Sequence, residues 1–164
     1  MYQLKYKNND TVLKQETYPM PDGTELVLLK YPLLEQTGIV GHCFSTRYGG
    51  VSEGFLESMN LSFSRGDKKE SVEENFRRIT SVLGKRIEDL VFTDQTHTTN
   101  VRKVTAADAG CGIRKERDYT DIDGLITDEP GLVLATFYAD CVPLYFVDPV
   151  HRAIGLSHSG WRGT

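Results

Sequence analysis

The sequence predicts an α/β or α+β fold in which strands outnumber helices. Two observations indicate this: short apolar segments bounded by turn residues recur along the chain, and a helical period occurs clearly in one place. A chain of 164 residues is about the size of one domain and can bury a core without disulfides. We therefore expect a single domain over residues 1–164.

Strands are expected in the first part of the chain. Apolar and polar residues alternate over residues 2–6, and an apolar run at residues 25–29 follows a turn at residues 21–23. Residues 39–44, His42 among them, predict a further strand. This strand leads into a loop with Gly49-Gly50, where the backbone can take a positive φ or approach a ligand closely.

One amphipathic helix is predicted over residues 71–83. Its apolar positions recur at steps of four, three and four residues, which places them on one face. Ser71 and Glu74 can form a capping box, and Gly84 suits the C-terminal end of the helix. The solvated face is expected to carry Glu73, Glu74, Arg77 and Arg78.

Six strands are predicted after the helix. They cover residues 90–93, 100–104, 124–127, 132–138, 142–147 and 153–157. The polar stretch 107–121 has no clear period, so we expect a long loop or a short helix there. Pro143 lies inside a predicted strand, which indicates an edge or a bulge because proline cannot donate to the ladder.

The final residues indicate that the fold continues beyond them. Gly160 and Gly163 bracket a turn, and Thr164 could cap a helix. We therefore expect the domain to be truncated at its C terminus.

The composition argues against several classes of partner and location. With 19 Lys and Arg residues against 23 Asp and Glu, the net charge is −4, which disfavours broad electrostatic binding to nucleic acid or anionic membranes. No apolar run approaches the roughly 20 residues that cross a bilayer, and the N terminus lacks a signal-peptide core. Cys43, Cys111 and Cys141 are an odd number without close spacing, so free thiols in the cytoplasm are expected.

Polar residues at predicted strand ends form a candidate metal site: His97, Cys141 and His158. A rigid sheet could hold these three side chains at fixed distances. Two imidazoles and a thiolate are a favourable set for Zn²⁺, and three protein ligands leave the fourth tetrahedral position open. The gaps of 44 and 17 residues are too long for a local zinc finger. The alternative is a buried cysteine with hydrogen-bonded histidines.

Other polar residues are candidates for chemistry or for ordinary turns and surfaces. Asp140 precedes the predicted thiolate and could orient a ligand or accept a proton, or it could simply form a turn. Arg47 and Arg162 could each hold phosphate or carboxylate with two hydrogen bonds, although loop arginines are more often solvated. Asp121 and Asp123 are expected in a turn, with a role behind a metal ligand or in acid–base chemistry as the other option.

Five motifs in order resemble one bacterial family. They are Ser45-Thr46-Arg47-Tyr48-Gly49-Gly50-Val51-Ser52, Asp94-Gln95-Thr96-His97, Asp123-Gly124-Leu125-Ile126-Thr127, Ala139-Asp140-Cys141-Val142-Pro143 and His158-Ser159-Gly160-Trp161-Arg162-Gly163. Over about residues 40–164 the chain resembles the proteins once labelled multicopper polyphenol oxidase or laccase-domain proteins. That family is now described as zinc-dependent purine nucleoside phosphorylases with adenosine deaminase activity. Four histidines cannot hold several coppers, which argues against the oxidase label.

The resemblance implies a fold, a metal site and two reactions. It implies layered mixed β-sheets with flanking helices, of the cytotoxic-necrotizing-factor-like cysteine hydrolase type, and zinc bound by His97, Cys141 and His158. It also implies phosphorolysis of adenosine, inosine, guanosine and S-methyl-5′-thioadenosine, and deamination of adenosine. The expected partners are purine nucleosides and phosphate, bound by a monomer or weak homodimer.

For these reactions, Asp140 and Cys141 are the candidate catalytic residues. Asp140 would move protons, and Arg47 and Arg162 would place phosphate, mainly through orientation and charge complementarity.

Two alternatives stay open. In the first, Cys141 is a nucleophile with His158 or His97 as its base, in an amide hydrolase that edits a peptidoglycan precursor. In the second, the zinc is structural and the chain is a non-catalytic module.

Overall fold

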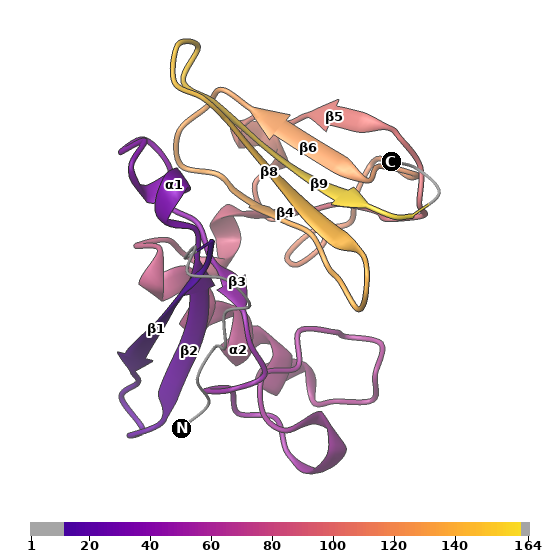
Figure 1. Cartoon of the computed structure of the whole chain (residues 1–164). Coiled ribbons are helices and arrows are strands. Elements are labelled where there is room, and N and C mark those ends of the chain that lie inside the picture. The colour runs from indigo at the N-terminus through magenta and orange to yellow at the C-terminus, as the bar shows by residue number, and fades with distance from the viewer. Residues whose placement is uncertain (1–11, 162–164) are drawn as a thin grey trace. The chain divides into compact units, whose positions relative to one another are not determined.

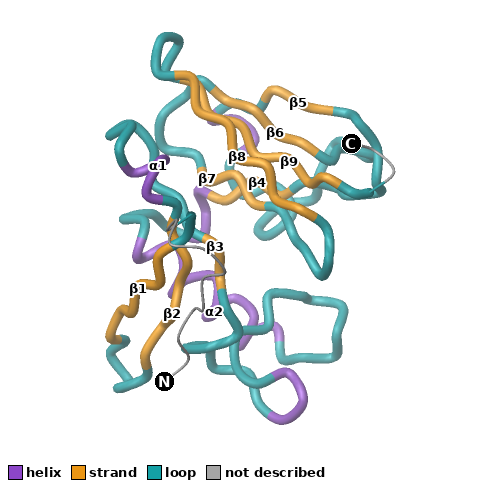
Figure 2. The backbone as a smooth tube through the Cα atoms, viewed as in Figure 1, coloured by secondary structure: helices purple, strands orange, loops and turns teal. Residues whose placement is uncertain are grey.

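The computed structural model describes residues 12–161 (Figure 1). These residues fall into two compact units, one up to Gly84 and one from Lys85 onward. Both are built from short strands joined by loops and turns, with few helices, so the predicted mixed α/β class is confirmed (Figure 2). The predicted strand at residues 2–6, the end of the turn predicted between Gly160 and Gly163, and the predicted cap at Thr164 lie outside the described residues. A single domain over residues 1–164 stays a prediction.

The first unit contains an antiparallel sheet of three strands, in the order β1-β2-β3. Strand β1 spans Lys14–Pro19, β2 spans Glu25–Lys30 and β3 spans Phe44–Ser45. The turn between β1 and β2 has Gly23 at φ 85°, and β2 covers the apolar run predicted as a strand. Leu26 and Leu28 on β2 are fully buried and form part of this unit's core.

The strand predicted over residues 39–44 is wrong except at its last residue. The short helix α1, Pro32–Glu35, is followed by a turn with Gly38 at φ 66°, and strand pairing resumes only at Phe44. His42 is therefore in a loop. Its Nε2 accepts the Tyr31 backbone N–H at 2.7 Å, and its carbonyl accepts Lys30 Nζ at 2.6 Å. Here the backbone N–H of Tyr31 and the carbonyl of His42 are hydrogen-bonded to side chains instead of to a neighbouring strand.

Helix α2 spans Lys69–Val82, so it begins two residues before the predicted start. The predicted capping box is wrong because Lys68 is the N-cap and Ser71 already lies within the first turn. The predicted apolar face is confirmed at Val72 and Phe76, which are buried. Gly84 takes φ 64° just after the helix, as its predicted C-terminal role requires.

Arg78 was predicted on the solvated face of this helix, and that prediction is wrong. Its side chain is only 7% exposed and donates hydrogen bonds to Thr24 Oγ1 at 2.7 Å and to the Gly49 carbonyl at 2.9 Å. It also forms ion pairs with Asp22 and Glu74. Because its charge is satisfied inside the unit, the guanidinium fastens the helix to the β1–β2 turn and the glycine loop.

The second unit contains two sheets. A parallel pair joins β4, Leu90–Phe92, to β7, Val133–Ala135. A four-stranded mixed sheet has the order β5-β6-β9-β8. Its strands are β5 (Val101–Lys103), β6 (Gly124–Thr127), β8 (Val142–Asp148) and β9 (Ala153–Ser159).

All six strands predicted for this half are present. Strand β8 is at the edge of its sheet, which confirms the position inferred from Pro143. Strand β9 continues to Ser159, so His158 lies within a strand rather than after one.

Loops surround these strands. The stretch 107–121 starts in the short 3₁₀ helix Ala106–Asp108 and continues as turns and bends from residue 109, in agreement with the predicted loop or short helix. Further 3₁₀ turns are Gly54–Leu56 in the first unit and Ile87–Asp89 in the second. Between residues 12 and 161, no helix has the length and apolar character that a membrane span requires.

The core of the second unit lies against one face of the four-stranded sheet. Its buried members are Val91, Val104, Cys111, Tyr119 and Leu125. The Tyr119 hydroxyl donates to the Phe92 carbonyl, which ties the loop before β6 to the end of β4. This packing fixes the ends of β4, β6 and β9, where the polar residues gather.

Replacing Arg78 with Gln should destabilise the protein by about 2–3 kcal/mol, because the charge-assisted hydrogen bonds of a buried guanidinium are lost. Arg77→Gln, on the exposed face of the same helix, should cost at most about 0.5 kcal/mol. Urea unfolding of both variants measures the difference. Equal losses would show that Arg78 does not fasten the helix.

Candidate metal centre

The second unit brings His97, Cys141 and His158 together. One ligand atom from each lies within 4.8 Å of the others. His97 is in the loop after β4, Cys141 immediately precedes β8, and His158 is on β9. Because β8 and β9 pair antiparallel with Pro143 opposite His158, the start of β8 carries Cys141 to the same end of the sheet.

The spacing of the three side chains suits a tetrahedral metal ion. His97 Nε2 lies 3.8 Å from Cys141 Sγ. With zinc bonds of about 2.3 Å to sulfur and about 2.05 Å to nitrogen, tetrahedral angles place nitrogen and sulfur about 3.6 Å apart. The two imidazole rings meet edge to face, with centroids 4.7 Å apart. The donor set therefore suits a metal ion, and the cluster could bind one if its widest separation, up to 4.8 Å, closes by about 1 Å.

Asp123, immediately before β6, binds the ring of His158 and the backbone of His97. The Asp123 carboxylate is 1% exposed, and its Oδ2 lies 2.6 Å from His158 Nδ1. The same carboxylate accepts the backbone N–H groups of Thr96 at 2.9 Å and His97 at 3.1 Å. Burial alone would raise the pKa of this carboxyl, but the Thr96 amide and His158 lower it below its usual range.

The hydrogen bond to Asp123 sets which nitrogen of His158 can bind metal. An ionised carboxylate only accepts hydrogen bonds, so His158 Nδ1 carries the proton and donates it. The lone pair on Nε2 is then left for a metal, in the arrangement common behind metal-bound histidines. The sequence predicted either a turn or a role behind a metal ligand for Asp123, and the structure favours the second.

The backbone at His97 is strained, and its neighbours hold it. His97 has φ 66°, a conformation that costs a non-glycine residue about 1–3 kcal/mol. On one side Asp123 binds the backbone, and on the other Gln95 pairs with the backbone of Phe137 through two hydrogen bonds of 2.7 Å. Sequence reasoning missed Gln95 because its partner is 42 residues away.

Cys141 is half-buried, and the exposed Asp140 lies beside it. Cys141 Sγ is 3.7 Å from Asp140 Oδ1. Partial burial, followed by the negative charge of Asp140, raises the pKa of the Cys141 thiol. A divalent cation at Sγ would act in the opposite direction and favour the thiolate. The pair thus has a donor for metal and a solvent-accessible carboxylate next to it.

Two predicted site residues are not brought to this cluster by the described structure. Arg47 belongs to the first unit, where its Nη2 donates to the Glu57 carbonyl at 2.7 Å. Arg162 lies outside the described residues. A role for either arginine in placing phosphate stays a prediction.

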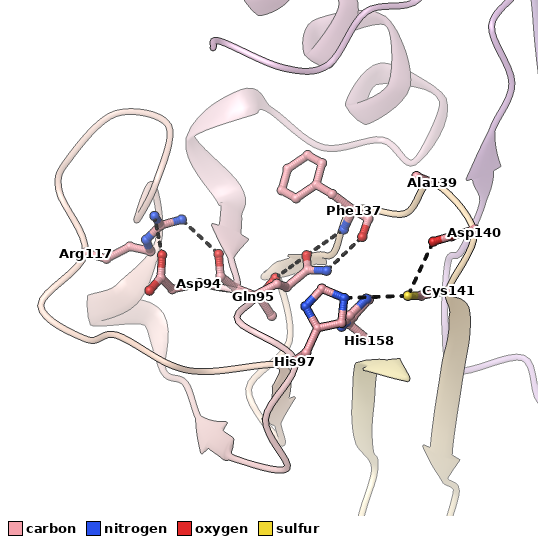
Figure 3. A pocket seen from close by; sticks show the side chains of 10 residues that line it. Asp94, Gln95, His97, Arg117, Phe137, Ala139, Asp140, Cys141 and His158 are labelled. Atoms are coloured by element: carbon pink, nitrogen blue, oxygen red, sulfur yellow. Dashed lines mark hydrogen bonds and ion pairs between the residues drawn. The ribbon is translucent and has the colours of Figure 1, made fainter. Parts of the chain in front are cut away.

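A cavity of about 420 Å³ in the second unit contains the cluster (Figure 3). Its lining combines charged, polar and apolar side chains from β9, the loop after β4, the loop before β6 and the loop between β7 and β8. These residues are Thr93, Asp94, Gln95, His97, Arg117, Phe137, Ala139, Asp140, Cys141 and His158. The three candidate metal ligands therefore face a space that a small molecule can enter.

Residues 41–164 match the family model described as multi-copper polyphenol oxidoreductase laccase. The match covers most of the chain and includes all three residues of the cluster. The chain belongs to this family.

Relatives of the chain include proteins named as nucleoside phosphorylases. The purine nucleoside phosphorylase YlmD of Geobacillus stearothermophilus is 41% identical over 121 residues, which are 73% of this chain and 44% of that protein. The human purine nucleoside phosphorylase LACC1 is 40% identical over 126 residues, 75% of this chain and 27% of that protein. The chain thus spans less than half the length of either relative.

Solved structures share the fold. The structure of the Bacillus licheniformis hypothetical protein YfiH matches with a TM-score of 0.73 and 37% identity, over 83% of this chain and 50% of that one. The structure of YlmD from Geobacillus stearothermophilus matches with a TM-score of 0.66 and 41% identity, over 74% and 45%.

Replacing Gly160 with Ala should weaken metal binding by about 10- to 100-fold. A Cβ at this position would lie 2.8 Å from His97 Cδ2, so the imidazole would have to move away from the other two ligands. Competition with a coloured zinc chelator measures the affinity.

Gly41→Ala is the matched control, since its Cβ would meet only Leu83, at an ordinary 3.7 Å. An unchanged zinc affinity in Gly160→Ala would mean that the position of His97 does not govern binding.

Proposed function

We propose that this chain forms the metal-binding part of a zinc-dependent purine nucleoside phosphorylase that also deaminates adenosine. The observation that carries the proposal is the His97–Cys141–His158 cluster in a cavity, in a chain 41% identical to a protein named purine nucleoside phosphorylase. The proposed substrates are adenosine, inosine, guanosine and S-methyl-5′-thioadenosine, with phosphate. The cysteine hydrolase-type fold, a cytoplasmic location and a monomer or weak homodimer are part of the same proposal.

A single zinc ion is favoured over a multicopper centre because the chain has too few histidines to bind several coppers. The chain has four histidines. Outside the cluster, His42 accepts the Tyr31 amide in the first unit, and His151 is bonded to Asp148 at the β8–β9 turn. Neither is a ligand of the cluster, so the described residues offer one mononuclear site. Because one copper ion could use the same donors, metal analysis of the purified protein separates copper from zinc.

Zinc, Asp123 and the loop around His97 would have separate roles in the cavity. Bound zinc would supply a Lewis acid that polarises an oxygen or nitrogen atom in the site. Asp123 would keep His158 oriented, and the fixed loop around His97 would keep the ligand set from rearranging during turnover.

Asp140 is the proposed proton carrier. Its carboxylate lies beside Cys141 and is exposed to solvent, so it can exchange protons with water. In deamination it would accept a proton from the attacking water, and in phosphorolysis it would give one to the departing purine. Arg47 and Arg162 would place phosphate, and Cys141 would act as a metal ligand at the catalytic centre.

Incubation of the protein with adenosine, with and without phosphate, tests this function. We expect adenine only when phosphate is present, and inosine from deamination. Cys141→Ala should lose bound zinc and lower both activities by about 100-fold or more, because a ligand is removed. If the zinc-loaded wild-type protein forms neither adenine nor inosine, the proposal is contradicted.

Cys43→Ala is the control for the loss of a thiol. Burial raises the pKa of Cys43 to about 11, and it lies in the first unit, so its replacement should leave zinc content unchanged.

Iodoacetamide tests the hydrolase alternative: metal-free protein that stays active and loses activity when Cys141 is alkylated would identify a nucleophile. If the zinc-loaded protein shows no turnover and unfolds when a chelator removes the zinc, the zinc is structural.

A further inference from the structure

We propose that Arg117 forms a phosphate-binding subsite in the cavity, at the end away from Cys141. The inference rests on the proposed function, because phosphorolysis needs an anion held beside the nucleoside. It names a residue that neither the sequence motifs nor the ligand set indicated.

The charges of the cavity lining single out Arg117. Of the ten lining residues in the described part of the chain, Arg117 is the one with a permanent positive charge. Asp94 and Asp140 are the acidic members of the lining. An anion that enters this cavity therefore meets one guanidinium, which Asp94 partly neutralises, whereas Asp140 opposes anion binding at the other end.

The guanidinium of Arg117 is held in place and still has donors to offer. Nη1 donates to the Thr93 carbonyl at 2.8 Å, and Nη2 pairs with Asp94 Oδ1 at 2.8 Å. A guanidinium carries five N–H groups, so these two contacts leave three for another acceptor. The side chain is 31% exposed, so an anion can reach it. A guanidinium fixed in this way binds phosphate oxygens with less loss of conformational entropy than a free one.

Asp94 has two roles in this arrangement. Its Oδ1 holds Arg117, and its Oδ2 accepts the Asp121 backbone N–H at 3.2 Å. Its negative charge also lies next to the proposed phosphate and repels it. Removing that charge while keeping the side chain's shape should therefore tighten phosphate binding.

The position of Arg117 suits the geometry of phosphorolysis. In Figure 3, Arg117 and Asp94 lie at one end of the row of lining side chains, and Cys141 and Asp140 lie at the other. With the purine toward the metal ligands, the ribose lies between them and Arg117. A phosphate oxygen then forms a bond to C1′, the C1′–N9 bond breaks, and its electron pair leaves with the purine. The purine takes up a proton, and ribose 1-phosphate is the second product.

A calorimetric titration of inorganic phosphate into the zinc-loaded protein tests the subsite directly. Arg117→Gln should weaken phosphate binding by about tenfold or more, because charge-assisted hydrogen bonds are lost. Asp94→Asn should tighten it. Arg114→Gln is the matched control: it removes the same charge from the same loop, where Arg114 pairs with Glu88 and does not line the cavity.

A purely structural Arg117 gives a different pattern. If it only fastens its loop to β4, then Arg117→Gln and Asp94→Asn both lower the melting temperature, and neither changes phosphate affinity. That result would overturn the inference. The opposite shifts in phosphate affinity for the two variants cannot arise from loss of the ion pair alone, since both variants lose it.

Activity separates this inference from the proposed function. If the wild-type protein cleaves adenosine, Arg117→Gln should raise the KM for phosphate at least tenfold more than the KM for adenosine. Equal KM values for phosphate in the wild type and Arg117→Gln would refute the subsite and leave the phosphorylase intact. If the wild type shows no phosphorolysis, the phosphorylase proposal fails, and the calorimetric shifts still decide whether Arg117 binds an anion.

Discussion

The candidate site depends on one buried carboxylate. Asp123 accepts hydrogen bonds from His158 and from the backbone of the loop that carries His97. An unpaired buried charge would cost several kcal/mol, so the carboxylate requires these donors as much as they require it. The same carboxylate therefore orients the His158 ring and holds the backbone that carries His97 beside it.

The sheet supplies the rest of the geometry. Asp123 immediately precedes β6, His158 lies on the adjacent strand β9, and Cys141 immediately precedes β8 on the other side of β9. Three neighbouring strands therefore deliver a supporting carboxylate and two ligands to one end of the sheet. Gly124 helps, because a Cβ there would lie 3.0 Å from both the Ser157 hydroxyl and a Val101 methyl, which would push β6 away from its neighbours. A site built on paired strands is held more firmly than one built on loops alone.

The sequence predicted what local patterns control and missed what distant partners decide. All the strands of the second half, and the edge position of Pro143, follow from apolar runs and from proline's missing donor. The burial of Arg78 could not be predicted, since its partners Asp22 and Gly49 lie 56 and 29 residues away. The same holds for Gln95 and for the choice between two roles of Asp123. Residue types indicated the candidate metal ligands, but only the folded chain shows which polar residues support them.

The most direct test of this account is X-ray absorption at the zinc edge of the protein loaded with one equivalent of zinc. The structure predicts a first shell with one sulfur at about 2.3 Å and two imidazole nitrogens at about 2.0–2.1 Å, completed by one light atom. A shell of nitrogen and oxygen without sulfur would contradict it, because Cys141 would then not belong to the site that Asp123 holds together.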